Sequence, residues 1–84
     1  MWKFKKAGFD GDCKLFGVNI FDYEWESTGQ QIEVLDPLYK EPKPMTVYTA
    51  NIGNKQVTFA AGEFSNGVYG FYVKRRNIFA KHSD

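Results

Sequence analysis

Apolar and polar residues alternate along most of the chain, as in half-buried β-strands, and no stretch follows the 3.6-residue apolar period of a helix. The clearest alternation lies in residues 45–62, on both sides of Gly53-Asn54. Glycine at the first loop position favours a type II′ hairpin turn. Closing the chain there places Tyr48 opposite Phe59 and sorts apolar and polar positions onto opposite faces. The polar face of this hairpin holds Thr49, Asn51, Gln56 and Thr58.

A second turn signal, Asn66-Gly67, is typical of a type I′ hairpin. Pairing from this turn places Phe64 opposite Tyr69. Residues 45–75 are therefore expected to form a three-stranded antiparallel meander.

The first half of the chain predicts a similar unit. A hairpin closed at Thr28-Gly29 would pair Trp25 with Ile32 and Glu24 with Glu33. This arrangement would place a second group of strands beside the meander.

A three-residue loop at 10–12 would pair Phe4 with Val18. The apolar positions change parity between Ile20 and Phe21, which indicates a bulge or a sharp bend. Residues 36–44, which contain three prolines, are expected to connect the two halves.

Together these elements predict one all-β domain over residues 1–84. Its expected architecture is a small antiparallel sandwich or open barrel of five to six strands, built from two three-stranded meanders. Residues 77–84 are expected to form a frayed tail or a short helical turn.

Composition narrows the class of protein. The chain has 84 residues, of which 18% are aromatic, and a net charge of +1. Aromatic side chains supply a large apolar area to a core that is small at this length. The single cysteine, Cys13, excludes an internal disulfide, and no apolar run approaches the roughly 18 residues that span a bilayer. We therefore expect a cytoplasmic protein with no membrane partner.

Catalytic, metal and cofactor sites have little support in the sequence. The single histidine, His82, could act with Cys13 only if the tail docked on the domain. Residues 10–12 begin like a calcium loop but lack the later ligands, and one cysteine with one histidine rarely makes a zinc site. We expect no enzymatic activity, no metal and no cofactor.

Asp22, Glu24 and Glu26 occupy alternate positions, so they would share one strand face, and the predicted hairpin would add Glu33 opposite Glu24. Opposed like charges destabilise a sheet. Two interpretations follow: a site for a cation or a basic partner, or a solvated outer face that discourages edge pairing.

Residues 69–71, with the sequence Tyr-Gly-Phe, precede the basic cluster Lys74, Arg75 and Arg76. Aromatic and basic side chains occur together in sheets that bind single-stranded nucleic acid. The low net charge and the six acidic residues between positions 22 and 41 oppose phosphate binding. The same aromatic residues would equally serve as the core of a small sheet.

The strand over residues 68–73 is apolar on both faces, and only one face can meet a two-sheet core. We expect the other face to contact a protein partner or a second copy in a homodimer, with Phe64, Tyr69 and Phe71 as anchors. The favoured function is a small non-catalytic protein-interaction module, for example a bacterial or phage accessory protein. The alternative is a small β-barrel that binds single-stranded nucleic acid through its aromatic residues and Lys74, Arg75 and Arg76.

Overall fold

Within residues 2–74, which a computed structural model describes, the chain forms seven β-strands and one 3-10 helix. The elements are β1 (Trp2–Phe9), β2 (Lys14–Leu15), β3 (Val18–Asn19), η1 (Ile20–Asp22), β4 (Glu26–Leu35), β5 (Pro42–Ile52), β6 (Lys55–Ser65) and β7 (Val68–Lys74). The predicted tail at 77–84 lies outside the described residues. No helix in the described part of the chain is both long and apolar enough to cross a bilayer.

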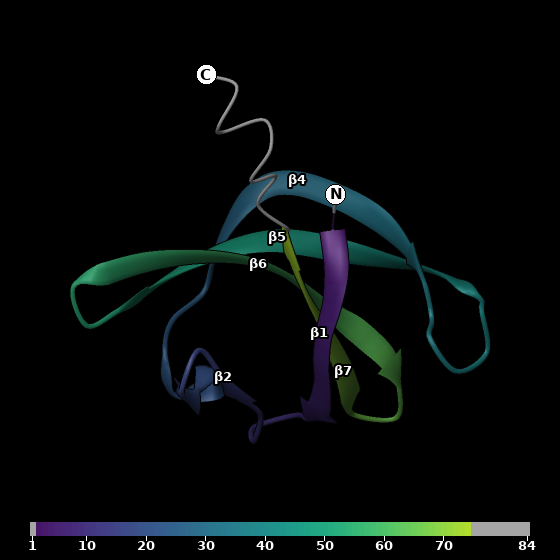
Figure 1. Cartoon of the computed structure of the whole chain (residues 1–84), viewed down its shortest axis with the longest axis horizontal. Coiled ribbons are helices and arrows are strands. Elements are labelled where there is room, and N and C mark those ends of the chain that lie inside the picture. Colours follow the sequence, from purple (N-terminus) through teal and green to yellow (C-terminus); the bar gives the residue numbers. More distant parts are fainter. Residues whose placement is uncertain (1, 75–84) are drawn as a thin grey trace, which may run out of the picture.

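Five strands form one antiparallel sheet in the order β1-β7-β6-β5-β4, and β2 and β3 form a small separate ladder. The sheet is strongly bent, with β1 running across the direction of β4 and β5, and it does not close into a barrel (Figure 1). The all-β class is therefore confirmed. One five-stranded sheet takes the place of the two predicted three-stranded meanders.

The predicted meander over residues 45–75 is present as β5, β6 and β7, up to the last described residue. Gly53-Asn54 and Asn66-Gly67 are its two turns, and Tyr48 pairs with Phe59 as expected. Gly53 and Gly67 have positive φ angles of 63° and 81°, a conformation that glycine adopts without strain. Short-range turn chemistry therefore determines this part of the fold.

The predicted register between β6 and β7 is wrong beyond the turn. Glu63, rather than Phe64, pairs with Tyr69, because a bulge lies between Glu63 and Ser65. The Glu63 carboxylate accepts the Gly67 N–H at 2.7 Å, which ties the bulge to the turn. The Phe64 ring then lies over Gly70, where any Cβ would overlap it. The absent side chain at Gly70 makes room for the ring.

The predicted hairpin at Thr28-Gly29 is also wrong. These residues form a bulge within β4, between the pairs Ser27–Tyr48 and Gln31–Thr46. On both sides of the bulge, β4 pairs with β5. The Thr28 hydroxyl donates to the Val47 carbonyl at 3.0 Å and replaces a missing ladder bond. Pairing along the long strand β5 thus gives β4 more ladder hydrogen bonds than a local hairpin would. Consequently Glu24 does not face Glu33, Trp25 does not face Ile32, and Glu33 pairs with Pro44.

The loop at residues 10–12 turns the chain as expected, with the Asp12 N–H donating to the Phe9 carbonyl at 2.9 Å. The returning chain does not follow β1, however, and the predicted pairing of Phe4 with Val18 is wrong. Phe4 pairs with Tyr72 because β7 provides a longer partner than β3. The bend predicted at Ile20-Phe21 is confirmed, since η1 begins there.

The connection predicted over residues 36–44 is shorter, because β5 already begins at Pro42. Proline lacks the N–H that a ladder needs. The β5–β6 ladder ends at the Thr46–Ala61 pair, so the β6 side of Pro42 and Pro44 carries no ladder bonds. The prolines therefore fit within the strand.

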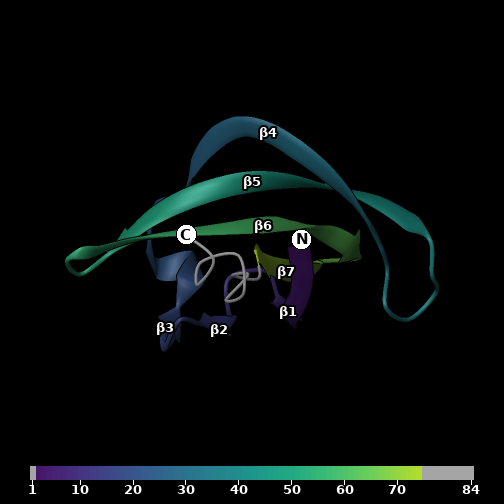
Figure 2. The ribbon, with the colours of Figure 1, turned by 45° about the horizontal axis from the view of Figure 1, so that its top comes forward.

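Both faces of the sheet are apolar. The segment containing β2, β3 and η1 lies over one face of the sheet (Figure 2). The core on that face includes Leu15, Ile20, Phe59 and Phe71. On the other face, the curvature of the sheet encloses a second cluster of Met45, Val47, Ala60 and Tyr72. The Tyr72 hydroxyl donates to the Leu35 carbonyl of β4 at 3.3 Å, which links two strands that are not adjacent in the sheet. The β2–β3–η1 segment therefore covers one apolar face, and the bending of the sheet covers the other.

Candidate functional site

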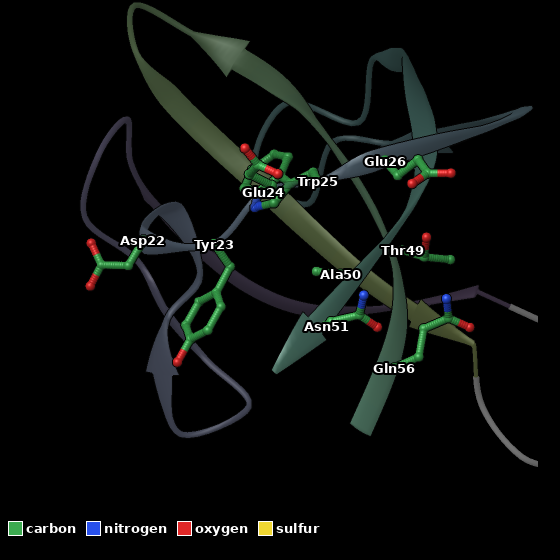
Figure 3. A pocket seen from close by; sticks show the side chains of 9 residues that line it. All are labelled: Asp22, Tyr23, Glu24, Trp25, Glu26, Thr49, Ala50, Asn51 and Gln56. Atoms are coloured by element: carbon green, nitrogen blue, oxygen red, sulfur yellow. The ribbon is translucent and has the colours of Figure 1, made fainter. Parts of the chain in front are cut away.

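A pocket of about 420 Å³ lies where the segment before β4 meets the ends of β5 and β6 (Figure 3). Its volume is within the range of small-ligand sites. We call it the acidic pocket; it is lined by Asp22, Tyr23, Glu24, Trp25, Glu26, Thr49, Ala50, Asn51 and Gln56. Asp22 and Tyr23 lie on one side, and Thr49, Asn51 and Gln56 lie on the other (Figure 3).

Trp25 determines the path of the segment that forms one wall. Its Nε1–H donates to the Ile20 carbonyl at 2.8 Å. Its ring contacts the rings of Phe21, Tyr48 and Phe59, with centroids 5.1–5.2 Å apart. The half-buried indole thus fixes the residues on either side of it, Glu24 and Glu26, which are exposed.

Asn19 holds the other end of this wall. Its side-chain oxygen accepts the N–H groups of Cys13 and Phe21, at 3.1 and 3.2 Å. Its side-chain nitrogen donates to the Gly11 carbonyl at 3.2 Å and lies 3.4 Å from the Asp22 carboxylate. This single amide therefore stabilises the turn that leads into η1 and positions Asp22 at the pocket.

The three carboxylates of the pocket have no basic side chain among the lining residues. Within residues 2–74 the one ion pair joins Lys43 to Glu41, which are not part of the pocket. The described residues contain no group of three or more side chains suited to a metal ion. The pocket is therefore a region of negative potential next to an indole and a phenol, without a metal-binding geometry.

The sequence predicted part of this site. Asp22, Glu24 and Glu26 were expected on one strand face, and they instead line one pocket from η1, a loop and the start of β4. Glu33 is not among the lining residues. The contributions of Thr49, Asn51 and Gln56 were missed, although they belong to the predicted polar face of the hairpin, because their proximity to the acidic residues depends on long-range pairing.

The three aromatic residues expected to bind a partner do not share a surface. Phe71 has no exposed surface and packs in the main core, where Tyr69 contacts it. Phe64 lies on the opposite face with Phe4 and Tyr72. Their role in partner binding stays a prediction, and in this fold it would fall to Phe64 and Tyr69, which are half-buried.

The basic cluster falls mostly outside the described residues, since Arg75 and Arg76 are not among them. Lys74 is exposed at the end of β7, opposite Trp2 of β1. His82 also lies outside the described residues.

Exposed apolar side chains lie at the end of β4 and in the connection that follows it. The sequence predicted this connection but not its apolar surface. The side chains of Leu35, Leu38 and Tyr39 are 61%, 74% and 70% exposed. Buried Asp36 fixes the loop, because its carboxylate accepts the N–H groups of Leu38 and Tyr39 at 2.6 and 3.1 Å. The prolines located this connection in the sequence, but no local pattern shows that its leucine and tyrosine side chains are exposed.

Cys13 is buried against Gly8, where an added Cβ would lie 2.6 Å from the cysteine sulfur. Burial raises the pKa of the Cys13 thiol above its usual 9.0, with a smaller opposing effect from Lys6. Burial also raises the pKa of Tyr72 above 10.0, and the charge of Asp36 adds to this effect. These groups therefore favour the neutral form in the folded protein.

This preference predicts a loss of stability in alkali. A group whose pKa is higher in the folded state contributes fully at low pH, and the contribution disappears as pH rises through the folded pKa. We expect the free energy of unfolding, from urea titrations, to be constant between about pH 7 and 8 and to fall above about pH 9. In Cys13→Ala the decline should begin at higher pH. An identical pH dependence in both proteins would contradict the contribution of Cys13.

The sequence matches no protein-family model and no curated protein, and the fold matches no solved structure.

Proposed function

We propose that this chain is a non-catalytic protein-interaction module whose acidic pocket binds a basic side chain of a partner. The observation that carries the proposal is that the residues lining one pocket include three acidic and two aromatic residues and no basic residue. Asp22, Glu24 and Glu26 supply charge, and Trp25 and Tyr23 supply aromatic surface.

The chemistry of the lining favours a guanidinium or an ammonium group. Carboxylates accept charge-assisted hydrogen bonds from both groups. A cation near an indole face gains about 0.5–2 kcal/mol from the ring quadrupole. The side-chain oxygens of Thr49, Asn51 and Gln56 provide further acceptors on the opposite wall.

The alternative, binding of single-stranded nucleic acid, depends on Lys74, Arg75 and Arg76. The acidic pocket repels phosphate, so that function would have to use another surface. The pocket therefore supports the protein-interaction proposal more directly than the alternative.

The proposal predicts weak, charge-dependent binding of N-acetylarginine amide, measured by amide chemical shifts in a titration. The shifts should map to the pocket residues. Glu24→Gln and Glu26→Gln should each weaken binding about two- to five-fold, the size expected of one exposed ion pair. Glu33→Gln, the same change outside the pocket, is the matched control and should leave the affinity unchanged.

N-acetylcitrulline amide, which has the same shape without the charge, should not bind. Equal binding of the two ligands would contradict the proposal, as would an equal loss of affinity in Glu33→Gln.

A further inference from the structure

One edge of β5 is open beside the acidic pocket. The β4–β5 ladder begins with the pair Glu26–Thr49, whereas β5 continues to Ile52. Within the described residues, no strand therefore pairs with residues 50–52 on the β4 side. We call this stretch the open edge, and two of its residues, Ala50 and Asn51, line the pocket.

The main-chain groups of Asn51 point out of this edge. Residues that flank a two-residue hairpin loop form a hydrogen-bonded pair, and such pairs alternate along the ladder. Ile52 pairs with Lys55 next to the loop, so Ile52 and Ala50 direct their N–H and C=O groups toward β6. Asn51 directs its own toward the β4 side.

The hydrogen bond to the Val47 carbonyl supports the conclusion that the main-chain groups of Asn51 point toward the β4 side. Val47 has the same parity in β5 as Asn51, and its carbonyl accepts the hydroxyl of Thr28 on β4. Outside the strand ladders, the backbone hydrogen bonds of residues 2–74 do not involve Asn51. One N–H donor and one C=O acceptor are therefore available at the wall of the pocket.

The space beside Asn51 on the β4 side is where the next residues of β4 would lie if that strand were longer. If β4 had continued in register, Glu24 would pair with Asn51. The chain diverges because Trp25 packs into the core and donates to the Ile20 carbonyl. The open edge therefore has no partner strand at the place that an extended β4 would occupy.

On the basis of the proposed function, we propose that the acidic pocket takes an extended basic segment of a partner protein, which adds to the open edge as a short antiparallel strand. One residue of the segment exchanges two main-chain hydrogen bonds with Asn51. Its side chain then lies on the face of Thr49 and Asn51, next to Glu26, which pairs with Thr49. A lysine or arginine at that position meets the charge of the pocket, while the main chain supplies affinity.

The other sheet edges fit such a segment less well. Lys3, Lys5 and Lys6 on β1 repel a basic chain, and a bulge between Phe4 and Lys6 interrupts its ladder. A second bulge interrupts β4 between Ser27 and Gln31. The open edge combines unpaired main-chain groups with the three acidic residues of the pocket.

The test uses the full chain and the peptide acetyl-Thr-Val-Arg-Val-amide, with N-acetylarginine amide as the reference ligand. The peptide ends one residue after the arginine because Glu26 already pairs with Thr49. The peptide should bind more tightly than the reference, with its largest shift changes at Asn51 and neighbouring pocket residues. Methylation of the arginine nitrogen removes the donor to the Asn51 carbonyl and should weaken binding about three- to ten-fold. Methylation of the following valine nitrogen is the matched control, because that N–H points away from β5, and it should have little effect.

The outcomes separate the two proposals. If neither ligand binds at the pocket, the proposed function fails. If the arginine amide binds there but the peptide gains nothing, or if both methylated peptides bind equally, strand addition is wrong and the pocket proposal stands. Shift changes of the peptide complex that centre on β1 or on the outer edge of β4 would also overturn strand addition.

Discussion

Replacing Trp25 with alanine is expected to lower the free energy of unfolding by about 3–5 kcal/mol, the range for large aromatic truncations in cores. Trp25 contacts four aromatic rings, two of them on the fully buried residues Phe59 and Phe71. Its hydrogen bond to the Ile20 carbonyl also joins η1 to the start of β4. Since domains are stable by only about 5–15 kcal/mol, this loss is a large fraction of the total stability. Urea titration followed by circular dichroism measures the change.

Trp25→Phe separates the ring from its hydrogen bond. Phenylalanine retains most of the aromatic packing and removes the Nε1 donor, so a loss of about 1–3 kcal/mol is expected, mainly from the unpaired Ile20 carbonyl. If Trp25→Ala cost less than 1 kcal/mol, the indole would not be the anchor that separates residues 23–25 from β5.

Replacing Phe71 with alanine is expected to destabilise the protein to a similar degree, by about 3–5 kcal/mol. The Phe71 ring is completely buried and contacts the rings of Phe21, Trp25, Phe59 and Tyr69. Such a truncation leaves a cavity in the centre of the main core. The midpoint of thermal unfolding should fall by more than 10 °C, since about 1 kcal/mol corresponds to 4–8 °C in a domain of this size.

Phe64→Ala is the matched control for Phe71→Ala. Phe64 is half-buried on the other face and, among residues 2–74, contacts two aromatic rings, so its truncation should cost about half as much. Equal losses in the two variants would contradict the assignment of Phe71 to the core and of Phe64 to the opposite face.

Local turn chemistry explains what could be predicted from the sequence. The turns at Gly53-Asn54 and Asn66-Gly67 fix the meander because they require residues that accept positive φ angles. Alternation alone then sets Tyr48 opposite Phe59. Both signals act over fewer than about twelve residues, so neither depends on the rest of the fold.

The pairings that failed depend on competition between distant strands. Thr28-Gly29 has the composition of a turn, but β5 offers β4 a longer ladder and Thr28 restores a bond within the bulge. Similarly, β1 pairs with β7 in preference to the short β3. As a result, β1 forms one edge of the five-stranded sheet. Turn propensity therefore determines where a hairpin forms only if the chain offers no alternative partner strand that is longer.

The candidate site was predictable in its acidic half and not in its other half. The alternation of Asp22, Glu24 and Glu26 indicated a shared surface, although its geometry is a pocket wall and not a strand face. The opposite wall, with Asn51, follows from the β4–β5 register, which no local pattern encodes. The open edge exists because Trp25 turns inward one residue before β4 begins.

Hydrogen exchange of individual amides tests the open edge most directly. In the free protein, the Asn51 N–H should exchange much faster than those of Thr49 and Ala50, which are directed into the β4 and β6 ladders. Saturation with acetyl-Thr-Val-Arg-Val-amide should slow exchange at Asn51 and leave the other two amides nearly unchanged. An Asn51 amide that is as protected as Ala50 in the free protein, or that the bound peptide does not slow, would contradict the account.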